Sequence, residues 1–248
     1  MIEFKNVSKV YGEKKALKEL NLTIQQGEIF GLLGHNGAGK STAIKSLVSI
    51  IQPTNGTITV DNLDLGTERM VIKRKIGYVP DTPDIFLQLT AGEYWNLMAA
   101  AYDVPQAEKE NRLVHLAQLF DMFSHQDETI SSFSHGMRQK TIIIGALLSD
   151  PDIWILDEPL QGLDPQAAFD LKEMIRAHAD KGKTVIFSTH ALETAQQLCD
   201  QLAILRKGEL LYHGSVEELL ETAPGESLES IYLKMAGRNS KEVEAYNE

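Results

Sequence analysis

The residues Gly34-His35-Asn36-Gly37-Ala38-Gly39-Lys40-Ser41-Thr42 fit the pattern G-x-x-x-x-G-K-[S/T]. An apolar run of strand character, residues 28–33, comes directly before them. After them, apolar side chains fall on one face of a predicted helix, namely Ala43, Ile44, Leu47, Val48 and Ile51. A strand, a glycine-rich loop and a helix in this order are the context of a phosphate-binding loop. The alternative, a chance glycine-rich turn before a capped helix, is disfavoured because both flanking elements are present.

The chemistry of this loop follows from its small residues. They let the backbone wrap closely around a phosphate, so that N–H groups and the positive end of the helix dipole point at the anion. Lys40 can then reach the β- and γ-phosphates, and the Ser41 hydroxyl is placed to bind Mg²⁺. The sequence therefore predicts a nucleoside triphosphate site.

Composition narrows the class of protein. The chain has 248 residues, 43% hydrophobic and 24% charged, which suits one large domain or a core with a smaller subdomain. Its net charge of −11 disfavours a nucleic-acid partner or a polybasic membrane patch. The single cysteine, Cys199, is expected to be a buried apolar residue. We expect no signal peptide, and the longest apolar run, residues 141–148, is too short to cross a bilayer. A cytoplasmic protein is predicted.

Hydrophobic periodicity divides the chain into parts. Residues 1–80 and 150–214 are predicted to form an α/β core, residues 81–149 a helical insertion, and residues 215–248 a short helical tail. Strands are expected at residues 2–7, 20–24, 28–33, 57–60, 76–80, 153–157, 184–188, 202–205 and 209–212. Further helices are expected at residues 91–102, 136–148, 165–181 and 191–199. A helical stripe of Leu113, Leu116, Ala117, Phe120 and Phe123 is expected in the core, and the polar end, residues 237–248, is expected to fray.

Two carboxylates follow a buried strand in the last third of the chain. Four apolar residues precede Asp157 and Glu158. In proteins with a phosphate loop, an Asp at the end of the neighbouring strand helps to hold Mg²⁺. The next carboxylate, Glu158, is placed to polarise an attacking water as a general base. A solvated acidic turn is the alternative for this pair when it is taken alone.

Two further motifs are less specific. His190 follows another predicted strand, and a His at that edge of an open α/β sheet can sense or hold a γ-phosphate, although a lone His is more often structural. Ser134, His135 and Gly136 open a helix. They predict either a simple N-cap or a second helix N-terminus able to receive a phosphate.

These features, in this order, resemble those of the ATP-binding cassette (ABC) ATPases over residues 2–235. Residues 34–42 look like Walker A and residues 153–158 like Walker B with its catalytic Glu158. Gly162-Leu163-Asp164 looks like the D-loop, His190 like the switch histidine, and Tyr11 matches the aromatic residue that stacks on adenine. The resemblance implies a single ABC ATPase domain: an α/β fold with a P-loop NTPase (RecA-like) core, an antiparallel β subdomain and the inserted helical subdomain.

The signature position indicates one branch of the family. Phe133-Ser134-His135-Gly136-Met137 departs from Leu-Ser-Gly-Gly-Gln and is similar to the Tyr-Ser-x-Gly-Met-x-Gln form of the ABC-2-type exporters. Residues 76–80, 89–93 and 228–233 also look like that branch. One departure concerns Asp81, which stands where many members carry a Gln that contacts Mg²⁺ and the lytic water. An Asp could still bind the metal, but it adds negative charge near the γ-phosphate.

The resemblance implies a mechanism with ATP and Mg²⁺ as cofactors. Two cassettes pair head to tail, and ATP lies between the Walker A loop of one and the signature of the other. Residues 34–42 would hold the phosphates, Ser41 and Asp157 would organise Mg²⁺, Glu158 would activate water and His190 would support the γ-phosphate. Ser134 and Gly136 would act in the site of the second cassette, and Asp164 of the D-loop is also expected to be a nucleotide-binding residue.

The resemblance also implies partners. A separate transmembrane permease is expected to dock on residues 82–149 and around Asp81, which would place the protein peripherally on the cytoplasmic face of the membrane. The second cassette is expected to be another copy of this chain, with a related cassette as the alternative. Two other function classes compete: a soluble ABC ATPase without transport, and a P-loop GTPase or kinase. The cargo cannot be deduced from the sequence.

Overall fold

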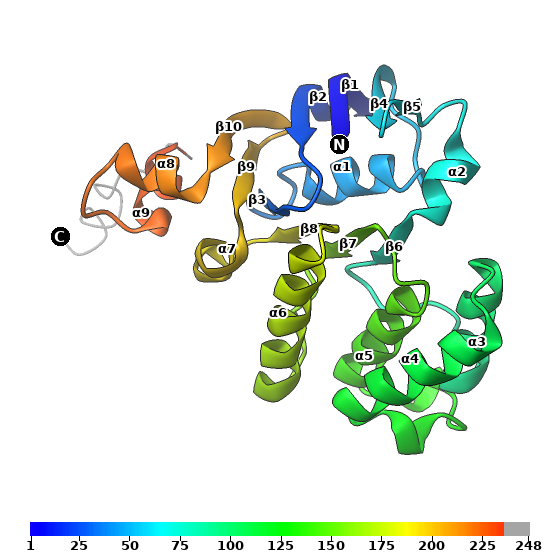
Figure 1. The fold of residues 1–248 in the computed structure, drawn as a ribbon. Coiled ribbons are helices and arrows are strands. Elements are labelled where there is room, and N and C mark those ends of the chain that lie inside the picture. The colour runs from blue at the N-terminus through cyan, green and yellow to red at the C-terminus, as the bar shows by residue number, and fades with distance from the viewer. Residues whose placement is uncertain (236–248) are drawn as a thin grey trace.

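A computed structural model describes residues 1–235 and shows two sheets with helices around and between them (Figure 1). A four-stranded sheet has the order β2-β1-β4-β5, and a six-stranded sheet has the order β10-β9-β3-β8-β7-β6. The strands are β1 (Ile2–Tyr11), β2 (Lys14–Ile24), β3 (Ile29–Leu33), β4 (Asn55–Val60), β5 (Leu63–Asp64), β6 (Ile76–Val79), β7 (Ile153–Asp157), β8 (Thr184–Thr189), β9 (Gln201–Arg206) and β10 (Glu209–Ser215). The α-helices are α1 (Lys40–Leu47), α2 (Arg69–Arg74), α3 (Ala91–Ala101), α4 (Gln106–Leu119), α5 (His135–Leu147), α6 (Pro165–Asp180), α7 (Leu192–Leu198), α8 (Val216–Glu221) and α9 (Leu228–Met235).

The six-stranded sheet places the candidate site. Strands β6, β7, β8, β3 and β9 pair in parallel, and only β10 is antiparallel to its neighbour. Every residue of β3 and β7 is buried, as expected for strands covered on both faces. Because parallel strands end at the same edge, Leu33, Asp157 and Thr189 bring the phosphate loop, Glu158 and His190 together.

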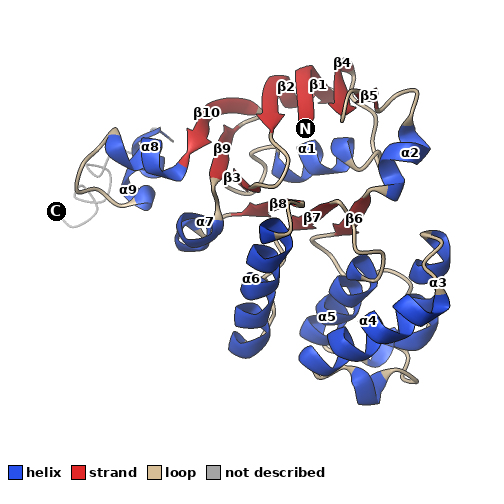
Figure 2. Cartoon of the chain, viewed as in Figure 1, coloured by secondary structure: helices blue, strands red, loops and turns tan. Residues whose placement is uncertain are grey.

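Helix α1 lies between the two sheets, and α5, α6 and α7 cover the other face of the six-stranded sheet (Figures 1 and 2). The apolar side of α1, with Ala43, Ile44 and Leu47, packs into one core cluster with β1, β2 and β4. Burying a large aliphatic side chain stabilises the fold by about 1.5–3 kcal/mol relative to leaving it exposed. The layer above the sheet therefore anchors the helix that the phosphate loop opens.

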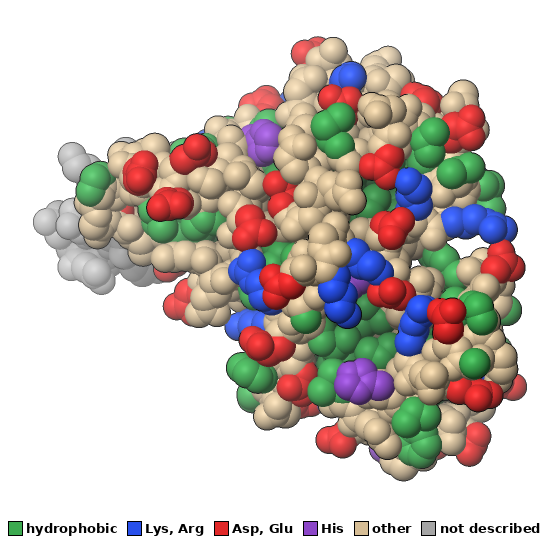
Figure 3. Space-filling model, viewed as in Figure 1, with side chains coloured by type: hydrophobic (Ala, Val, Ile, Leu, Met, Phe, Trp, Pro, Cys, Tyr) green, Lys and Arg blue, Asp and Glu red, His purple; other side chains and the backbone are tan. Residues whose placement is uncertain are grey.

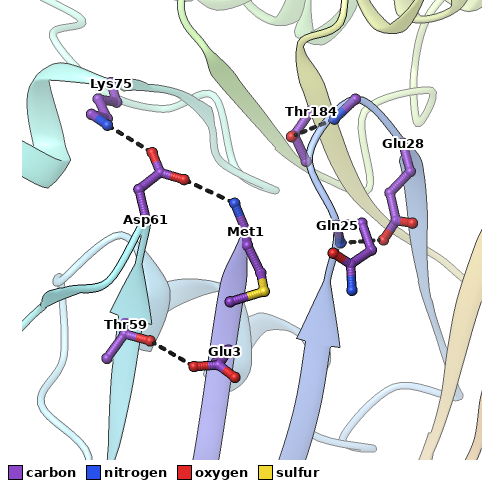
Figure 4. Close-up of polar contacts among 9 residues, drawn as sticks. Met1, Glu3, Gln25, Glu28, Thr59, Asp61, Lys75 and Thr184 are labelled. Atoms are coloured by element: carbon purple, nitrogen blue, oxygen red, sulfur yellow. Dashed lines mark hydrogen bonds and ion pairs between the residues drawn. The ribbon is translucent and has the colours of Figure 1, made fainter.

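The turn between the two sheets is fixed by hydrogen bonds (Figure 4). The Gln25 N–H donates to Glu28 Oε1 at 2.8 Å, and the Gly27 N–H donates to Thr184 Oγ1 on β8 at 3.1 Å. In the four-stranded sheet, Asp61 accepts from the Met1 amine at 2.8 Å and pairs with Lys75 at 2.7 Å. The Gly27–Thr184 hydrogen bond holds the turn before β3, and hence the phosphate loop that follows β3, against β8.

The helical segment confirms one local prediction and corrects another. Thr90 and Glu93 form a reciprocal capping box at the start of α3, and Trp95 Nε1 donates to the Thr141 carbonyl on α5 at 3.0 Å. The prediction that Phe123 lies in the core is wrong, because its side chain is 44% exposed. Helix α4 ends at Leu119, and Asp121 adopts a φ of +55°, so Phe123 leaves the helical stripe for a short 3-10 turn.

The fold class is confirmed, and the remaining differences concern element bounds. Strands β1 and β2 are longer than predicted, while α2 and β5 were not predicted. Helices α8 and α9 lie within the segment where a helical tail was predicted, whereas residues 237–248 lie outside the described residues. Within residues 1–235, no helix is long and apolar enough to cross a bilayer. On the face shown in Figure 3, acidic and basic side chains are interspersed.

Candidate functional site

The phosphate loop joins the end of β3 to the start of α1. Gly39 is the N-cap of α1 with a φ of +117°, a conformation that favours glycine, and an added Cβ would lie 2.9 Å from the Ala16 carbonyl oxygen. Within the loop, the Ala38 N–H donates to the His35 carbonyl at 3.0 Å. The loop borders a cavity of about 570 Å³, to which it contributes His35, Asn36, Gly37, Gly39, Lys40, Ser41 and Thr42. The predicted phosphate loop thus lies beside a cavity large enough for a nucleotide.

Lys40 is held in place although it is almost fully buried. Its side chain is 6% exposed, and Nζ donates to the Gly34 carbonyl at 2.7 Å. Nζ also lies 3.1 Å from Glu158 Oε1. A buried ammonium needs such partners because an isolated buried charge is very costly. The cation therefore faces the cavity with its position already fixed.

Asp157 ends β7 and is completely buried. It accepts a hydrogen bond from the Ser188 hydroxyl, and its Oδ2 has no hydrogen-bond partner among the described residues. Burial raises the pKa of Asp157 above its ordinary value, while the hydrogen bond from Ser188 and the nearby Ser41 hydroxyl oppose that change. An unsatisfied carboxylate oxygen beside a serine hydroxyl fits a hard divalent cation.

Glu158 has a strained backbone, and its carboxylate contacts two other site residues. Its φ is +50°, which a non-glycine residue rarely adopts, and its N–H donates to Ser188 Oγ at 3.0 Å. Glu158 Oε2 lies 3.0 Å from His190 Nδ1, so the carboxylate bridges Lys40 and His190. Such strain clusters at active sites. The carboxylate is in position to accept a proton from a water in the cavity.

Asp81 lies where the sequence placed it, at the edge of the same cavity. Its Oδ1 is 3.8 Å from Lys45 Nζ on α1, one helical turn after Ser41. Lys45 thus offsets part of the negative charge that Asp81 adds to the site. Lys45 could not be predicted as a partner of Asp81, because the two residues come from different segments.

Tyr11 and the signature residues differ in whether they border the cavity. Tyr11 ends β1, is half exposed and borders the cavity, and Lys9 Nζ lies 5.1 Å from its ring centroid. Ser134 caps α5 by accepting from the Met137 N–H at 3.3 Å. Asp164 caps α6 and pairs with Lys140 of α5 at 2.8 Å. Ser134, Gly136 and Asp164 do not border the cavity that the phosphate loop lines, although His135 does.

Other residues that line the cavity were not predicted to do so: Lys14, Ala16, Thr82, His135 and Gln161. Lys14 could have been suspected, because it follows the Gly12 turn beside Tyr11. Gln161 lies between Glu158 and the D-loop glycine, and His135 lies between the two predicted signature residues. Ala16 and Thr82 carry no sequence signal of their own.

One edge of the sheet carries a phosphate loop, a buried aspartate, and a glutamate that bridges a lysine and a histidine. These features together define a P-loop nucleoside triphosphatase. A family model described as ABC transporter matches residues 17–161. The chain belongs to the ATP-binding proteins of ABC transporters, and it is an ATPase of that family. The predicted family is therefore confirmed, and the alternative of a GTPase or kinase is wrong.

Two curated relatives match nearly the whole chain. The ABC transporter ATP-binding protein NatA of Bacillus subtilis (strain 168) is 34% identical over 238 residues, which cover 94% of this chain and 97% of NatA. The Nod factor export ATP-binding protein I of Burkholderia lata is 34% identical over 233 residues, which cover 93% of this chain and 76% of that protein.

Two solved structures share the fold. The ATP-binding subunit of an ABC transporter has a TM-score of 0.90 at 34% identity and covers 95% of this chain and 99% of its own. The dimeric post-hydrolysis cassette MJ0796 bound to ADP and Pi has a TM-score of 0.79 at 27% identity and covers 87% of this chain and 99% of its own. The prediction of an ATP-binding subunit of an ABC transporter is confirmed at the level of the family.

Proposed function

We propose that this protein is the ATP-hydrolysing subunit of an ABC-2-type exporter with a separate transmembrane permease. The proposal rests on one observation: the cavity of a single chain contains the phosphate loop but lacks two of the predicted signature residues. Ser134 and Gly136 lie outside the cavity formed by the phosphate loop of their own chain, so they are free to complete the site of a second cassette. A relative named for Nod factor export and a dimeric solved cassette support both parts of the proposal.

The phosphate loop and Lys40 bind and orient the triphosphate of ATP. The N-terminus of α1 and backbone N–H groups of residues 34–42 face the anion, apart from that of Ala38, which donates to the His35 carbonyl. Lys40 Nζ is already held by the Gly34 carbonyl at 2.7 Å. The half-exposed ring of Tyr11 stacks on the adenine base at the other end of the cavity. Asp81 contacts the same end of the triphosphate as Ser41.

Mg²⁺ fits the donor set formed by Ser41 and Asp157, with Asp81 as a further oxygen donor. When bound, Mg²⁺ neutralises charge on the β- and γ-phosphates. Asp157 Oδ2, which has no hydrogen-bond partner among the described residues, is the oxygen available to it.

Glu158 orients the attacking water and accepts its proton at a carboxylate oxygen. His190, 3.0 Å from Glu158 Oε2, holds that carboxylate and supports the γ-phosphate. Ser134, Gly136 and Asp164 of the second cassette close the open side and exclude water from the triphosphate. Two copies of this chain form the pair, which ATP binding holds together and hydrolysis releases.

The permease docks on residues 82–149 and around Asp81, at the cytoplasmic face of the membrane. Phe86 and Leu97 support this surface, because both are large apolar side chains that remain exposed there. The test is chemical crosslinking in native membranes, followed by affinity capture of the tagged chain in detergent. A polytopic membrane protein crosslinked to this chain is expected. A chain that stays in the cytosol with no such partner would instead favour a soluble ABC ATPase.

A further inference from the structure

The C-terminal part of the described chain touches the phosphate loop at the hairpin between β9 and β10. The Gly208 N–H donates to the Ala38 carbonyl at 2.8 Å, and the Gly208 carbonyl accepts from the Lys18 N–H at 2.8 Å. At the start of the loop, a Cβ added to Gly34 would lie 2.5 Å from the Leu205 carbonyl oxygen. The hairpin thus fits closely against both ends of the loop, and β10 then leads into α8 and α9 (Figure 1).

A third contact comes from α9 itself. The rings of His35 and Tyr232 lie 5.1 Å apart between centroids and are inclined by 68°, which is an edge-to-face arrangement. Tyr232 is 6% exposed and belongs to the main core cluster, because α9 packs against α7 and α8. His35 is exposed and borders the nucleotide cavity. Tyr232 is therefore the fixed ring and His35 the one that it holds.

We propose that Tyr232 is a positioning residue for ATP binding: its ring holds His35 and so keeps the phosphate loop in the shape that receives the triphosphate. Tyr232 does not touch the nucleotide. Its action rests on the role proposed above for the phosphate loop, but not on the permease or on dimerisation. It also gives a role to residues 228–233, which resemble a motif of the exporter branch but do not border the cavity.

The contact couples α9 to nucleotide affinity in both directions. If docking of α9 strengthens ATP binding, ATP binding must stabilise the docked α9 by the same factor. Helix α7, which α9 contacts, begins directly after His190 and Ala191. Helix α9 therefore contacts both the phosphate loop and α7, the helix that follows His190.

The first test measures the equilibrium Kd for ATP by calorimetry on the full chain. Tyr232→Leu removes the ring and is expected to raise the Kd about two- to tenfold, the range for one aromatic pair. Tyr232→Phe keeps the ring and should bind ATP more tightly than Tyr232→Leu. Ile231→Ala is the matched control, since Ile231 is a buried neighbour on α9 whose aliphatic side chain has no ring to pair with His35. If Ile231→Ala weakens ATP binding as much as Tyr232→Leu at equal loss of stability, helix packing rather than the ring pair is responsible and the proposal is overturned.

The second test separates the ring pair from the loop as a whole. In a His35→Ala background, Tyr232→Leu should change the Kd no further, because its partner ring is already absent. Nuclear magnetic resonance should show the His35 imidazole signal, assigned by its loss in His35→Ala, shifting in Tyr232→Leu without any nucleotide. ATP should slow hydrogen exchange of residues 228–235 in the unsubstituted chain but not in Tyr232→Leu. The proposal would be overturned if the effects of His35→Ala and Tyr232→Leu on the Kd were additive, or if the His35 signal did not move. An unsubstituted chain that fails to bind ATP would instead refute the proposed function.

Discussion

Lys40 Nζ lies 3.1 Å from Glu158 Oε1, so the cation assigned to the phosphates is paired with the carboxylate assigned to the attacking water. Both side chains are largely buried, and apart from Lys40 no group among the described residues pairs with Oε1 of Glu158. A triphosphate in the cavity would compete with Glu158 for Lys40. Binding of phosphate is therefore linked to release of the carboxylate towards water and His190.

Removal of Lys40 tests its share in ATP binding. Lys40→Ala should raise the Kd for ATP by about ten- to a hundredfold, since hydrogen bonds to charged groups contribute about 1.5–3 kcal/mol. Lys40→Arg keeps the charge with a different shape and should lose less. Calorimetric titration measures both variants, and equal Kd values for Lys40→Ala and the unsubstituted chain would contradict the assignment.

His190 should affect turnover more than binding. Because it contacts Glu158 Oε2 at 3.0 Å, His190→Ala is expected to lower kcat by about a hundredfold, while the Kd for ATP stays within about threefold. Steady-state phosphate release and equilibrium binding give the two values. A variant whose kcat is unchanged would remove His190 from the catalytic site.

Site residues that follow a strand could be predicted from the sequence, whereas contacts between distant segments could not. The phosphate loop, Asp157, Glu158 and His190 were predictable, because each follows an apolar strand and parallel strands end at one edge. The pairing of Lys45 with Asp81 and the contact of Tyr232 with His35 were not predictable, because each joins segments far apart in the chain. Such contacts depend on how helices pack, which local periodicity does not encode.

The same distinction applies to the fold. The capping box at Thr90 and Glu93 and the buried strands β3 and β7 follow from local chemistry, and they were predicted within a residue or two. The exposed position of Phe123 does not, because the helical spacing continues past the point where α4 ends. The proposed division into core, helical subdomain and tail stays a prediction.

His178 gives the protein a pH-dependent stability. Its Nε2 lies 2.9 Å from the Pro151 carbonyl and its ring lies 5.5 Å from Trp154. Burial, assisted by nearby Lys183, lowers the pKa of His178, so the folded chain holds the neutral ring. The unfolded state then binds the proton more readily, and this contribution to stability is present above about pH 6.5 and is lost as the pH falls towards the folded pKa.

Urea unfolding of His178→Gln tests this directly. The variant lacks the titrating ring, so the difference in free energy of unfolding between it and the unsubstituted chain should be smaller at about pH 5.5 than at about pH 7.5. Groups other than His178 titrate equally in both chains, so their contributions cancel when the two free energies of unfolding are subtracted. The same difference at both pH values would show that His178 is not held neutral.

Leu97 tests the permease surface without touching the nucleotide site. Leu97→Ser should lower recovery of the crosslinked membrane partner by about tenfold, since burial of one Leu contributes about 1.5–3 kcal/mol. ATP binding should not change. Leu211→Ser is the control, because Leu211 is another exposed leucine and lies on β10, away from residues 82–149. Equal recovery with both variants would argue against docking on the helical segment.

The composite ATP site is tested best by size-exclusion chromatography of the full-length Glu158→Gln chain with ATP and Mg²⁺, read alongside its turnover. Glu158→Gln keeps the shape of the side chain but removes the base, so ATP should bind without being hydrolysed and a dimer should accumulate. Turnover by the unsubstituted chain should rise faster than linearly with protein concentration. A Glu158→Gln chain that remains a monomer with ATP and hydrolyses it at the unsubstituted rate would contradict both the role of Glu158 and the shared site.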